Sequence, residues 1–275
     1  MLGQFPELEI DKARFERLRA SRSVLSHALA IEEKYEIVIN NYYDLEREIT
    51  NASIPELVRN NIKNKNFSDF RLVLNIRLVN FLSSVGLYSG QLSSHIYACN
   101  SGNNNIINEI KQLFTVEYNS SFMCRFMEAL KIYIQNSGIP IHRISSSKKW
   151  VDLNDECVEY SLYFGAQKSE LQFNGWFNKC VLREMPDEVN LRSSSRSYIE
   201  AISRIHKHAM KKIALTIKSS VREIEMAICD YLLVSKNKPM GLCAYEYQGK
   251  QKLREVLILT KSDLRLKLIK KIMSL

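Results

Sequence analysis

Hydrophobic residues recur at three- and four-residue steps along three long stretches of the chain, which is the spacing of one face of an α-helix. These stretches cover residues 10–50, 70–97 and 195–234. Charged residues of both signs separate the apolar positions of the first stretch, as expected for the solvated side of a helix. The pattern therefore predicts three long amphipathic helices, with a break over 51–69 after the first.

A fourth apolar stripe lies within residues 121–142 and has a marked end. Its members are Phe122, Phe126, Ala129, Leu130, Tyr133 and Ile134. Pro140 cannot continue a helix, and Asn136 or Gly138 is expected to take the left-handed backbone conformation that ends many helices. We therefore predict one helix here, preceded by a shorter helix over 106–114.

Two segments change from a helical to an alternating pattern, which is the period of a β-strand. In the first, 158–164 and 171–177 are interpreted as two strands joined by a turn. In the second, two alternating runs flank a polar turn and precede a final basic helix. The sequence thus predicts a β-hairpin inserted at about 150–182, and a C-terminal hairpin plus helix over about 243–275.

Glycine (9) and proline (5) are scarce for a chain of 275 residues, which favours long helices over a β architecture with many turns. We expect a mainly α fold with one or two small β-hairpins. The prediction is a single helical domain over 1–275, with its helical core at about 10–145 and 195–235. Hydrophobic residues make up 45% of the chain, enough to bury a core of ordinary size.

The net charge of +9 and the pI of about 9.2 suit a polyanionic partner such as RNA or DNA. Proteins that bind neither also carry such a charge, so composition leaves both interpretations open. No phosphate-cradling glycine-rich loop, GxSxG motif or internal repeat is present. Nucleotide hydrolysis and serine-hydrolase chemistry are therefore not expected.

Cysteine and histidine spacing argues against a metal site. The six cysteines stand at 99, 124, 157, 180, 229 and 243, so no zinc knuckle or CxxC motif is present. The five histidines also lack metal-ligand spacing, and we expect reduced thiols, no metal and no cofactor. No uninterrupted apolar run approaches 18 residues and the N-terminus does not resemble a signal peptide, so a cytoplasmic protein without membrane contact is expected.

The predicted helix within 121–142 resembles the signature helix of a bacterial group in the HEPN superfamily, all-helical proteins that include RNA-cleaving toxins and phage-defence effectors. In that group the helix reads roughly Met-Glu-Ala-Leu-Arg-Asn-Tyr-x-Gln-His, followed by a Gly-x-Pro turn. The matching residues here are Met127, Glu128, Ala129, Leu130, Tyr133, Gln135, Gly138 and Pro140. The run from Asn75 to Tyr88 resembles an upstream helix of the same group. The resemblance implies a HEPN-like helical bundle.

The positions that carry the family's chemistry differ in this chain. The resemblance implies that an arginine holds the scissile phosphate and a histidine helps activate the ribose 2′-hydroxyl, across a groove between two facing domains and without metal. Here Lys131 replaces the arginine, Ile132 the asparagine that follows it, and Asn136 the histidine. Asn136 cannot titrate, and Lys131 lacks the planar fork of arginine. The nearest substitute base is His142, so the candidate catalytic residues are Lys131, Asn136 and His142.

The candidates for contact with nucleic acid come from three places: the matching upstream helix, the basic and aromatic run 143–150, and the basic first half of the helix predicted from residue 195. They are Arg77, Arg143, Lys148, Lys149, Trp150, Arg204, His208, Lys211 and Lys212. The run 143–150 suits either a grip on a phosphate backbone, with Trp150 stacked on a base, or a plain surface linker. The other histidines favour structural interpretations: His27 at the surface beside Arg22, His95 near a helix C-terminus, and His206 packed at the edge of an apolar stripe.

Three hypotheses follow for the function. The first is a HEPN-like protein with a degraded ribonuclease motif that binds RNA or a partner protein, as a homo-oligomer or within a bacterial defence or toxin–antitoxin system. The second is an active metal-independent endoribonuclease that uses His142. The third is a structural helical subunit that binds no nucleic acid.

Overall fold

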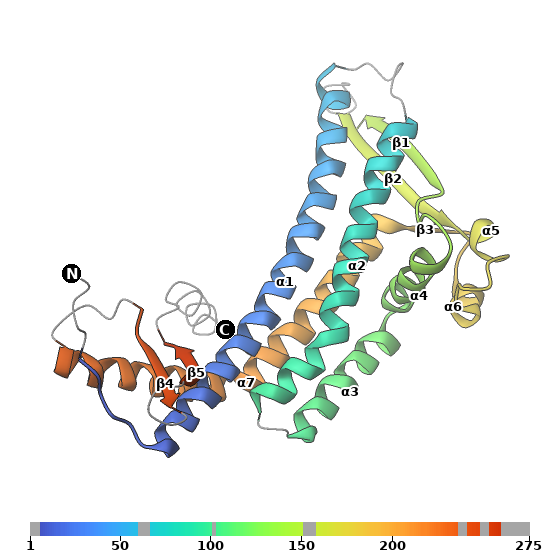
Figure 1. Ribbon diagram of the computed structural model, residues 1–275. Helices are drawn as coiled ribbons and strands as arrows, with labels where there is room; N and C mark the ends of the chain where they lie inside the picture. Colours follow the sequence, from blue (N-terminus) through green and yellow to red (C-terminus); the bar gives the residue numbers. More distant parts are fainter. Residues whose placement is uncertain are drawn as a thin grey trace. The chain divides into compact units, whose positions relative to one another are not determined.

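The computed structural model describes residues 6–59, 67–100, 103–150, 158–235, 241–247 and 253–259, and its fold is mainly α, as predicted (Figure 1). The helices are α1 (Lys12–Arg59), α2 (Phe67–Cys99), α3 (Asn104–Ser120), α4 (Phe122–Asn136), α5 (Lys168–Leu171), α6 (Lys179–Glu184) and α7 (Leu191–Ser235). The strands are β1 (Arg143–Trp150), β2 (Val158–Gln167), β3 (Glu188–Asn190), β4 (Cys243–Tyr247) and β5 (Leu253–Ile258).

The chain divides into two compact units. Unit 1 consists of Met1–Glu33, Gln91–Ile110 and Lys207–Leu275, and unit 2 consists of Lys34–Gly90 and Lys111–His206. The boundaries fall inside α1, α2, α3 and α7, so each of these four helices contributes residues to both units.

In unit 2, α1, α2 and α7 run side by side and enclose an apolar core (Figure 1). Its fully or almost fully buried members include Leu45, Ile49, Leu74, Leu78, Phe81, Phe126, Leu130, Tyr198 and Ile202. Burial of one such large side chain contributes about 1.5–3 kcal/mol. Strand β2 adds Phe164 and Ala166, which are 0% exposed. The three-stranded antiparallel sheet has the order β1-β2-β3.

Unit 1 has a core of its own. Phe15, Leu18, Ile31, Leu92, Ile96, Ala209, Ile213 and Ile217 are buried there on α1, α2 and α7. The antiparallel pair β4–β5 contributes Leu257, and Leu259 follows it. The two strands agree with the C-terminal hairpin that the sequence predicted, whereas the predicted final helix lies outside the described residues.

The inserted sheet differs from its prediction. Strand β2 pairs with β1, from Arg143 opposite Gly165 onward, instead of with 171–177. Gly165 does not open a turn: a Cβ there would lie 2.7 Å from the Tyr163 hydroxyl and 2.8 Å from a Glu188 carboxylate oxygen, so glycine allows β3 to approach. Leu171 ends α5 and is completely buried, so it anchors the segment as a core side chain. The predicted return strand was therefore wrong.

Three helix boundaries also differ from the predicted ones. Helix α1 continues past its predicted end at residue 50 and through Pro55 to Arg59. Helix α3 extends to Ser120, six residues beyond its predicted end. Helix α7 begins at Leu191, where the Asn190 side chain accepts hydrogen bonds from the N–H groups of Arg192 and Ser193, an N-cap that the periodicity does not reveal.

Candidate functional site

Helix α4 ends at Asn136, one of the two residues predicted to end it, but without a left-handed residue. Ser137 follows with φ −146°, and the N–H groups of Ser137 and Gly138 both donate to the Tyr133 carbonyl, at 2.8 and 3.4 Å. Gly138 is required for a different reason than predicted. A Cβ at this position would collide with the Tyr133 hydroxyl and lie 3.0 Å from its Cζ, so the glycine makes room for the phenol ring.

Lys131, the candidate phosphate-binding residue, is engaged inside unit 2. Its Nζ lies 2.7 Å from a carboxylate oxygen of Glu128, and its side chain is only 12% exposed. The other carboxylate oxygen of Glu128 accepts a hydrogen bond from the hydroxyl of Tyr198. Burial, reinforced by Glu128, raises the pKa of Tyr198 well above its ordinary value. The charge of Lys131 is therefore balanced within a network that joins α4 to α7.

Asn136 lies at the exposed end of the same helix. Its side-chain nitrogen donates a hydrogen bond of 2.8 Å to the carbonyl of Ile132, one turn earlier. An amide has no pKa in the physiological range and cannot accept a proton from a hydroxyl. Asn136, at the position that the resemblance assigns to the catalytic histidine, therefore makes a hydrogen bond within its own helix.

His142 is half-buried beside the end of α4, with its ring edge-on to Tyr133 at a centroid distance of 6.3 Å. Its Nδ1 accepts a hydrogen bond from the backbone N–H of Gln167 at 3.0 Å. Burial lowers the pKa of His142, Glu170 opposes this shift and Arg71 adds to it. Because the Nδ1 lone pair is occupied, the neutral ring carries its proton on Nε2 and is a poor proton acceptor.

Asn75, from the second matching stretch, fixes the segment that follows α4. It is 3% exposed, its Oδ1 accepts the N–H of Ile141 at 3.0 Å, and its amide donates to the carbonyl of Arg71. A buried backbone N–H without a hydrogen-bond partner costs free energy. Asn75 supplies the acceptor that the Ile141 N–H does not find within its own loop. The sequence marked Asn75 only as a polar residue of the matching stretch. A polar residue within an apolar helical stripe is the signal that could have revealed this role.

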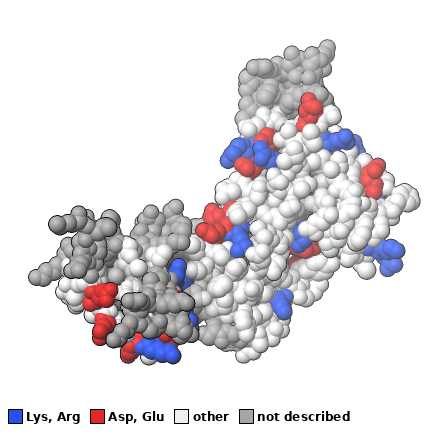
Figure 2. All heavy atoms as spheres, viewed as in Figure 1, with Lys and Arg blue, Asp and Glu red and all other residues white. Residues whose placement is uncertain are grey.

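The arginines predicted to bind nucleic acid are paired with carboxylates. Arg77 lies 3.1 Å from Glu48, Arg143 lies 3.2 Å from Glu188, and Arg204 forms two hydrogen bonds of 2.8 and 2.7 Å to Glu117. These pairs reduce the positive field that each arginine presents to solvent. On the face that Figure 2 shows, small groups of basic and acidic atoms lie close together and most of the described surface is uncharged.

The other predicted nucleic-acid-binding residues fall into two groups. In unit 1, Lys212 lies 2.5 Å and His208 4.0 Å from the same Glu109 carboxylate, and Lys211 is exposed. The backbones of Lys148, Lys149 and Trp150 form the end of β1, and their side chains lie outside the described part of the structure.

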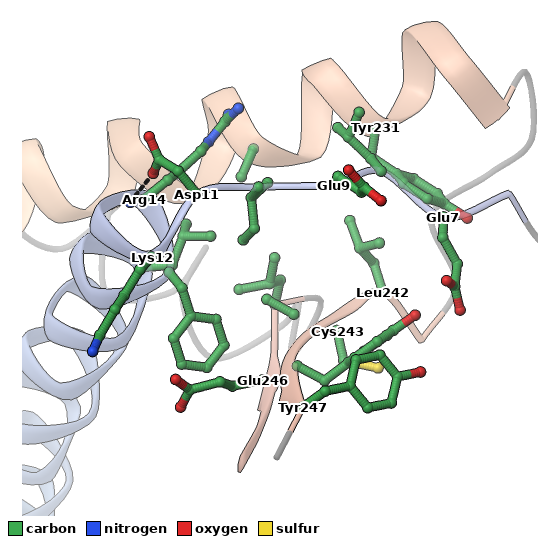
Figure 3. Close-up of a pocket in the computed structure, with 18 of the residues that line it drawn as sticks. Glu7, Glu9, Asp11, Lys12, Arg14, Tyr231, Leu242, Cys243, Glu246 and Tyr247 are labelled. Carbon is green, nitrogen blue, oxygen red and sulfur yellow. Dashed lines mark hydrogen bonds between the residues drawn. The ribbon is translucent and has the colours of Figure 1, made fainter. Parts of the chain in front are cut away.

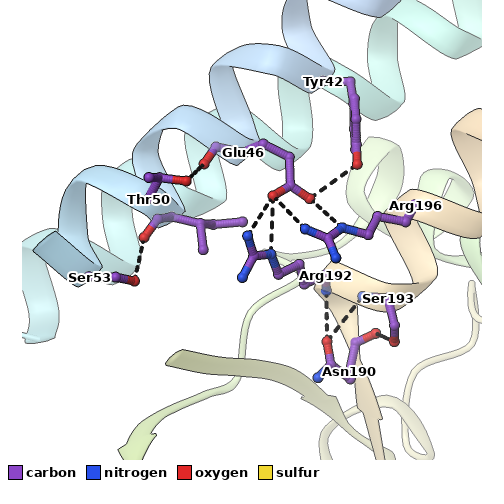
Figure 4. A network of polar contacts seen from close by, with 9 residues as sticks. Tyr42, Glu46, Thr50, Ser53, Asn190, Arg192, Ser193 and Arg196 are labelled. Carbon is purple, nitrogen blue, oxygen red and sulfur yellow. Dashed lines mark hydrogen bonds and ion pairs between the residues drawn. The ribbon is translucent and has the colours of Figure 1, made fainter. Parts of the chain in front are cut away.

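A second polar network, which the sequence did not reveal, joins α1 to the start of α7 in unit 2 (Figure 4). Glu46 accepts hydrogen bonds from Arg192 at 3.1 and 2.8 Å, from Arg196 at 2.9 and 3.1 Å, and from the Tyr42 hydroxyl at 3.1 Å. Burial alone would raise the pKa of Glu46, but the two arginines outweigh it and lower the pKa to about 2. The network ties α1 to the start of α7, and its central Glu46 side chain is only 19% exposed, so we interpret its role as structural.

Two histidine clusters lie away from α4. In unit 2, His206 is buried, stacks on Tyr35 at 3.7 Å and lies 3.2 Å from the Tyr88 hydroxyl, in agreement with a packed residue. In unit 1, His27 is half-buried and its Nδ1 lies 3.0 Å from the Nδ1 of His95. The surface position predicted for His27 was therefore wrong, because α1 and α2 pack together at this point.

Large apolar side chains are exposed around the end of α4. Ile132 and Ile139 are 45% and 54% exposed, and Phe173 and Trp176, in the loop after α5, are 89% and 58% exposed. The loop is tied to the end of α4 by a hydrogen bond from Asn174 to Ser137. We call these four residues the α4 apolar surface. Exposed aromatic residues on a loop fixed beside a helix end are candidates for a binding surface.

Two further features bear on function. Among the described residues, no group of three or more His, Cys, Asp or Glu side chains is placed to hold a metal ion. Within the same residues, Ser68–Cys99 is long and apolar enough to cross a membrane by length and composition, although core helices of soluble proteins pass the same test. Counting uninterrupted apolar runs did not find this helix, because scattered polar residues interrupt it.

Comparisons with models of protein families, with curated proteins and with solved structures found no match to this chain.

Proposed function

We propose that this chain is a HEPN-like helical protein that does not cleave RNA and acts by self-association through the α4 apolar surface. The resemblance of α4 and α2 to the HEPN signature supports the family assignment, and the facing domains of that family favour a second copy as the occupant. The exposure of Phe173 and Trp176, on the loop that Asn174 ties to the end of α4, is the observation that carries the proposal.

The chemistry of the site supports the loss of catalysis. Activation of a ribose hydroxyl requires a proton acceptor whose pKa is near neutral and whose lone pair is accessible. Asn136 cannot titrate, and the Nδ1 of His142 already accepts the Gln167 N–H. Lys131 would have to leave Glu128 before it could bind phosphate. Each component of the family's reaction is therefore missing or occupied.

The balance of exposed groups favours a protein partner over RNA. Arg77, Arg143 and Arg204 would each have to exchange a carboxylate for a phosphate, whereas the α4 apolar surface is exposed as it stands. Aromatic residues dominate the energetics of protein interfaces, and truncation of a central one typically costs 2 kcal/mol or more. The family context suggests that such a dimer operates in phage defence or in a toxin–antitoxin pair.

Sedimentation equilibrium tests the proposal. We expect a dimer of the natural chain at micromolar concentration, and a dissociation constant at least about 100-fold weaker in the double variant Phe173→Ser/Trp176→Ser. Leu215→Ser is the matched control, because Leu215 is 80% exposed but belongs to unit 1. A monomeric natural chain, or an equal effect of the control substitution, would contradict self-association through this surface.

The net charge of +9 favours RNA binding as the second candidate function. Incubation with RNA in EDTA distinguishes the hypotheses. We expect no cleavage. Metal-independent cleavage that disappears in His142→Ala would show an active ribonuclease. Uncleaved RNA that stays bound to the protein, with an affinity that falls steeply as salt is added, would show RNA binding.

A further inference from the structure

Unit 1 contains a cavity of about 780 Å³ that is separate from α4 and from the polar networks described above (Figure 3). Its walls are the N-terminal segment 6–12, helix α7 at Tyr231, and the segment 241–247 that includes β4. Phe15, Leu18 and Leu259, all at least 95% buried, contribute apolar lining. Cavities that bind small molecules usually measure about 300–1,000 Å³, so this one has the volume of a ligand site.

The charge of the lining is opposite to that of the whole protein. Four carboxylates line the cavity, from Glu7, Glu9, Asp11 and Glu246, against the two cations Lys12 and Arg14. Arg14 is already paired with Asp230, and Figure 3 shows Lys12 pointing away from Glu7 and Tyr231. A cavity of net negative charge in a chain of net charge +9 favours a cation over an anion.

Tyrosine rings supply the second element of cation recognition. Tyr231, Tyr245 and Tyr247 line the cavity, and the rings of Tyr245 and Tyr247 meet edge to face at a centroid distance of 5.1 Å. The Tyr245 hydroxyl is hydrogen-bonded to Glu7, and this bond, together with burial, raises its pKa. A tyrosine face attracts a positive charge within about 6 Å of the ring, and a carboxylate nearby strengthens the preference.

We propose that this cavity binds an organic cation, with its ammonium group held by Glu7, Glu9 and the tyrosine rings, which lie on the same side of the cavity in Figure 3, and its apolar body against Phe15, Leu18 and Leu259. An apolar cavity alone would accept neutral molecules of the same shape. The combination of four carboxylates with three tyrosines adds selectivity for positive charge. This site lies in unit 1 and does not depend on the function proposed for α4.

Calorimetric titration of the full chain with benzyltrimethylammonium tests the site, with neopentylbenzene as the neutral probe of the same shape and benzenesulfonate as the anion. We expect saturable binding of the cation at least about tenfold tighter than of either control, a difference of about 1.4 kcal/mol. Equal binding of the cation and its neutral counterpart, or no saturation by the cation at about 10 mM, would overturn the proposal.

Two pocket variants and one matched control assign the binding to this cavity. Glu9→Gln and Tyr247→Leu are each expected to weaken cation binding by about fivefold or more. Glu225→Gln removes the same charge from an exposed position of α7 outside the cavity. We expect this control to change the affinity for the cation by less than about twofold. Circular dichroism of each variant verifies the fold. Unchanged affinity in both folded pocket variants would refute the assignment.

Discussion

The Glu46 network offers the sharpest test of the packing in unit 2. We predict that Glu46→Gln destabilises the protein by about 2–3 kcal/mol at pH 7. The substitution keeps the shape of the side chain and one acceptor oxygen but removes the charge that Arg192 and Arg196 share. Both guanidinium groups would then lose their anionic partner, and the one remaining amide oxygen cannot accept the four hydrogen bonds that the carboxylate accepts from them.

The pKa of Glu46 sets the size of the expected destabilisation and its dependence on pH. The fall from 4.5 to about 2 corresponds to about 3 kcal/mol at about 1.4 kcal/mol per pKa unit, and the side chain is only 19% exposed. Because the folded pKa is lowered, this stabilisation is fully present above pH 4.5. It is lost progressively as the pH falls from 4.5 through the folded value of about 2.

Urea denaturation followed by far-ultraviolet circular dichroism measures the effect. The difference in the free energy of unfolding between the natural chain and Glu46→Gln should fall to less than half between pH 7 and about pH 3. Glu184→Gln is the control, because its side chain is 46% exposed and pairs only with Arg125, so we expect a loss below about 1 kcal/mol. The reasoning is refuted if the two variants cost the same, or if the Glu46 difference does not change with pH.

Three further predictions concern the end of α4. Asn75→Ala should lower the free energy of unfolding by about 1–3 kcal/mol, measured by urea denaturation, because the buried N–H of Ile141 loses its acceptor. Gly138→Ala should lower the melting temperature, and adding Tyr133→Phe should restore part of the loss, since the new Cβ collides with the phenol hydroxyl. His142 should titrate below 6.5 in an NMR experiment, because burial lowers its pKa. Its neutral form then adds stability above pH 6.5 that is lost as the pH falls through the folded value, and His142→Gln should remove this dependence.

Periodicity predicted the long helices because each of them has a continuous buried side. The stripe from Phe122 to Ile134 predicted α4, and the helix ends at Asn136, one of the two residues predicted to end it. Periodicity did not reveal β1, whose residues 143–150 are mostly polar and small and carry no alternating apolar signal. That strand forms because β2 offers its hydrogen-bonding edge, which is a tertiary effect that no local pattern records.

The candidate site was predicted less well than the helices. The identities of Lys131, Asn136 and His142 could be read from the sequence, but not their partners. Glu128 lies one turn from Lys131 and could have been anticipated, whereas the N–H that occupies His142 comes from Gln167, 25 residues later. Similarly, net charge counts Arg204 as a cation, and only the fold brings Glu117 against it. Sequence reasoning therefore overestimates the exposed positive charge.

Unit 1 is built from segments that lie far apart in the sequence, and this has a consequence for its synthesis. Arg14 at the start of α1 pairs with Asp230, 216 residues later, and the buried Phe15 and Leu18 lie beside it in the sequence. At about 5–20 residues per second, the ribosome needs roughly 10–40 s to make that span. During this interval the apolar side of the nascent helix has no α7 to cover it, so we expect this part of unit 1 to complete its core only after the last third of the chain has emerged.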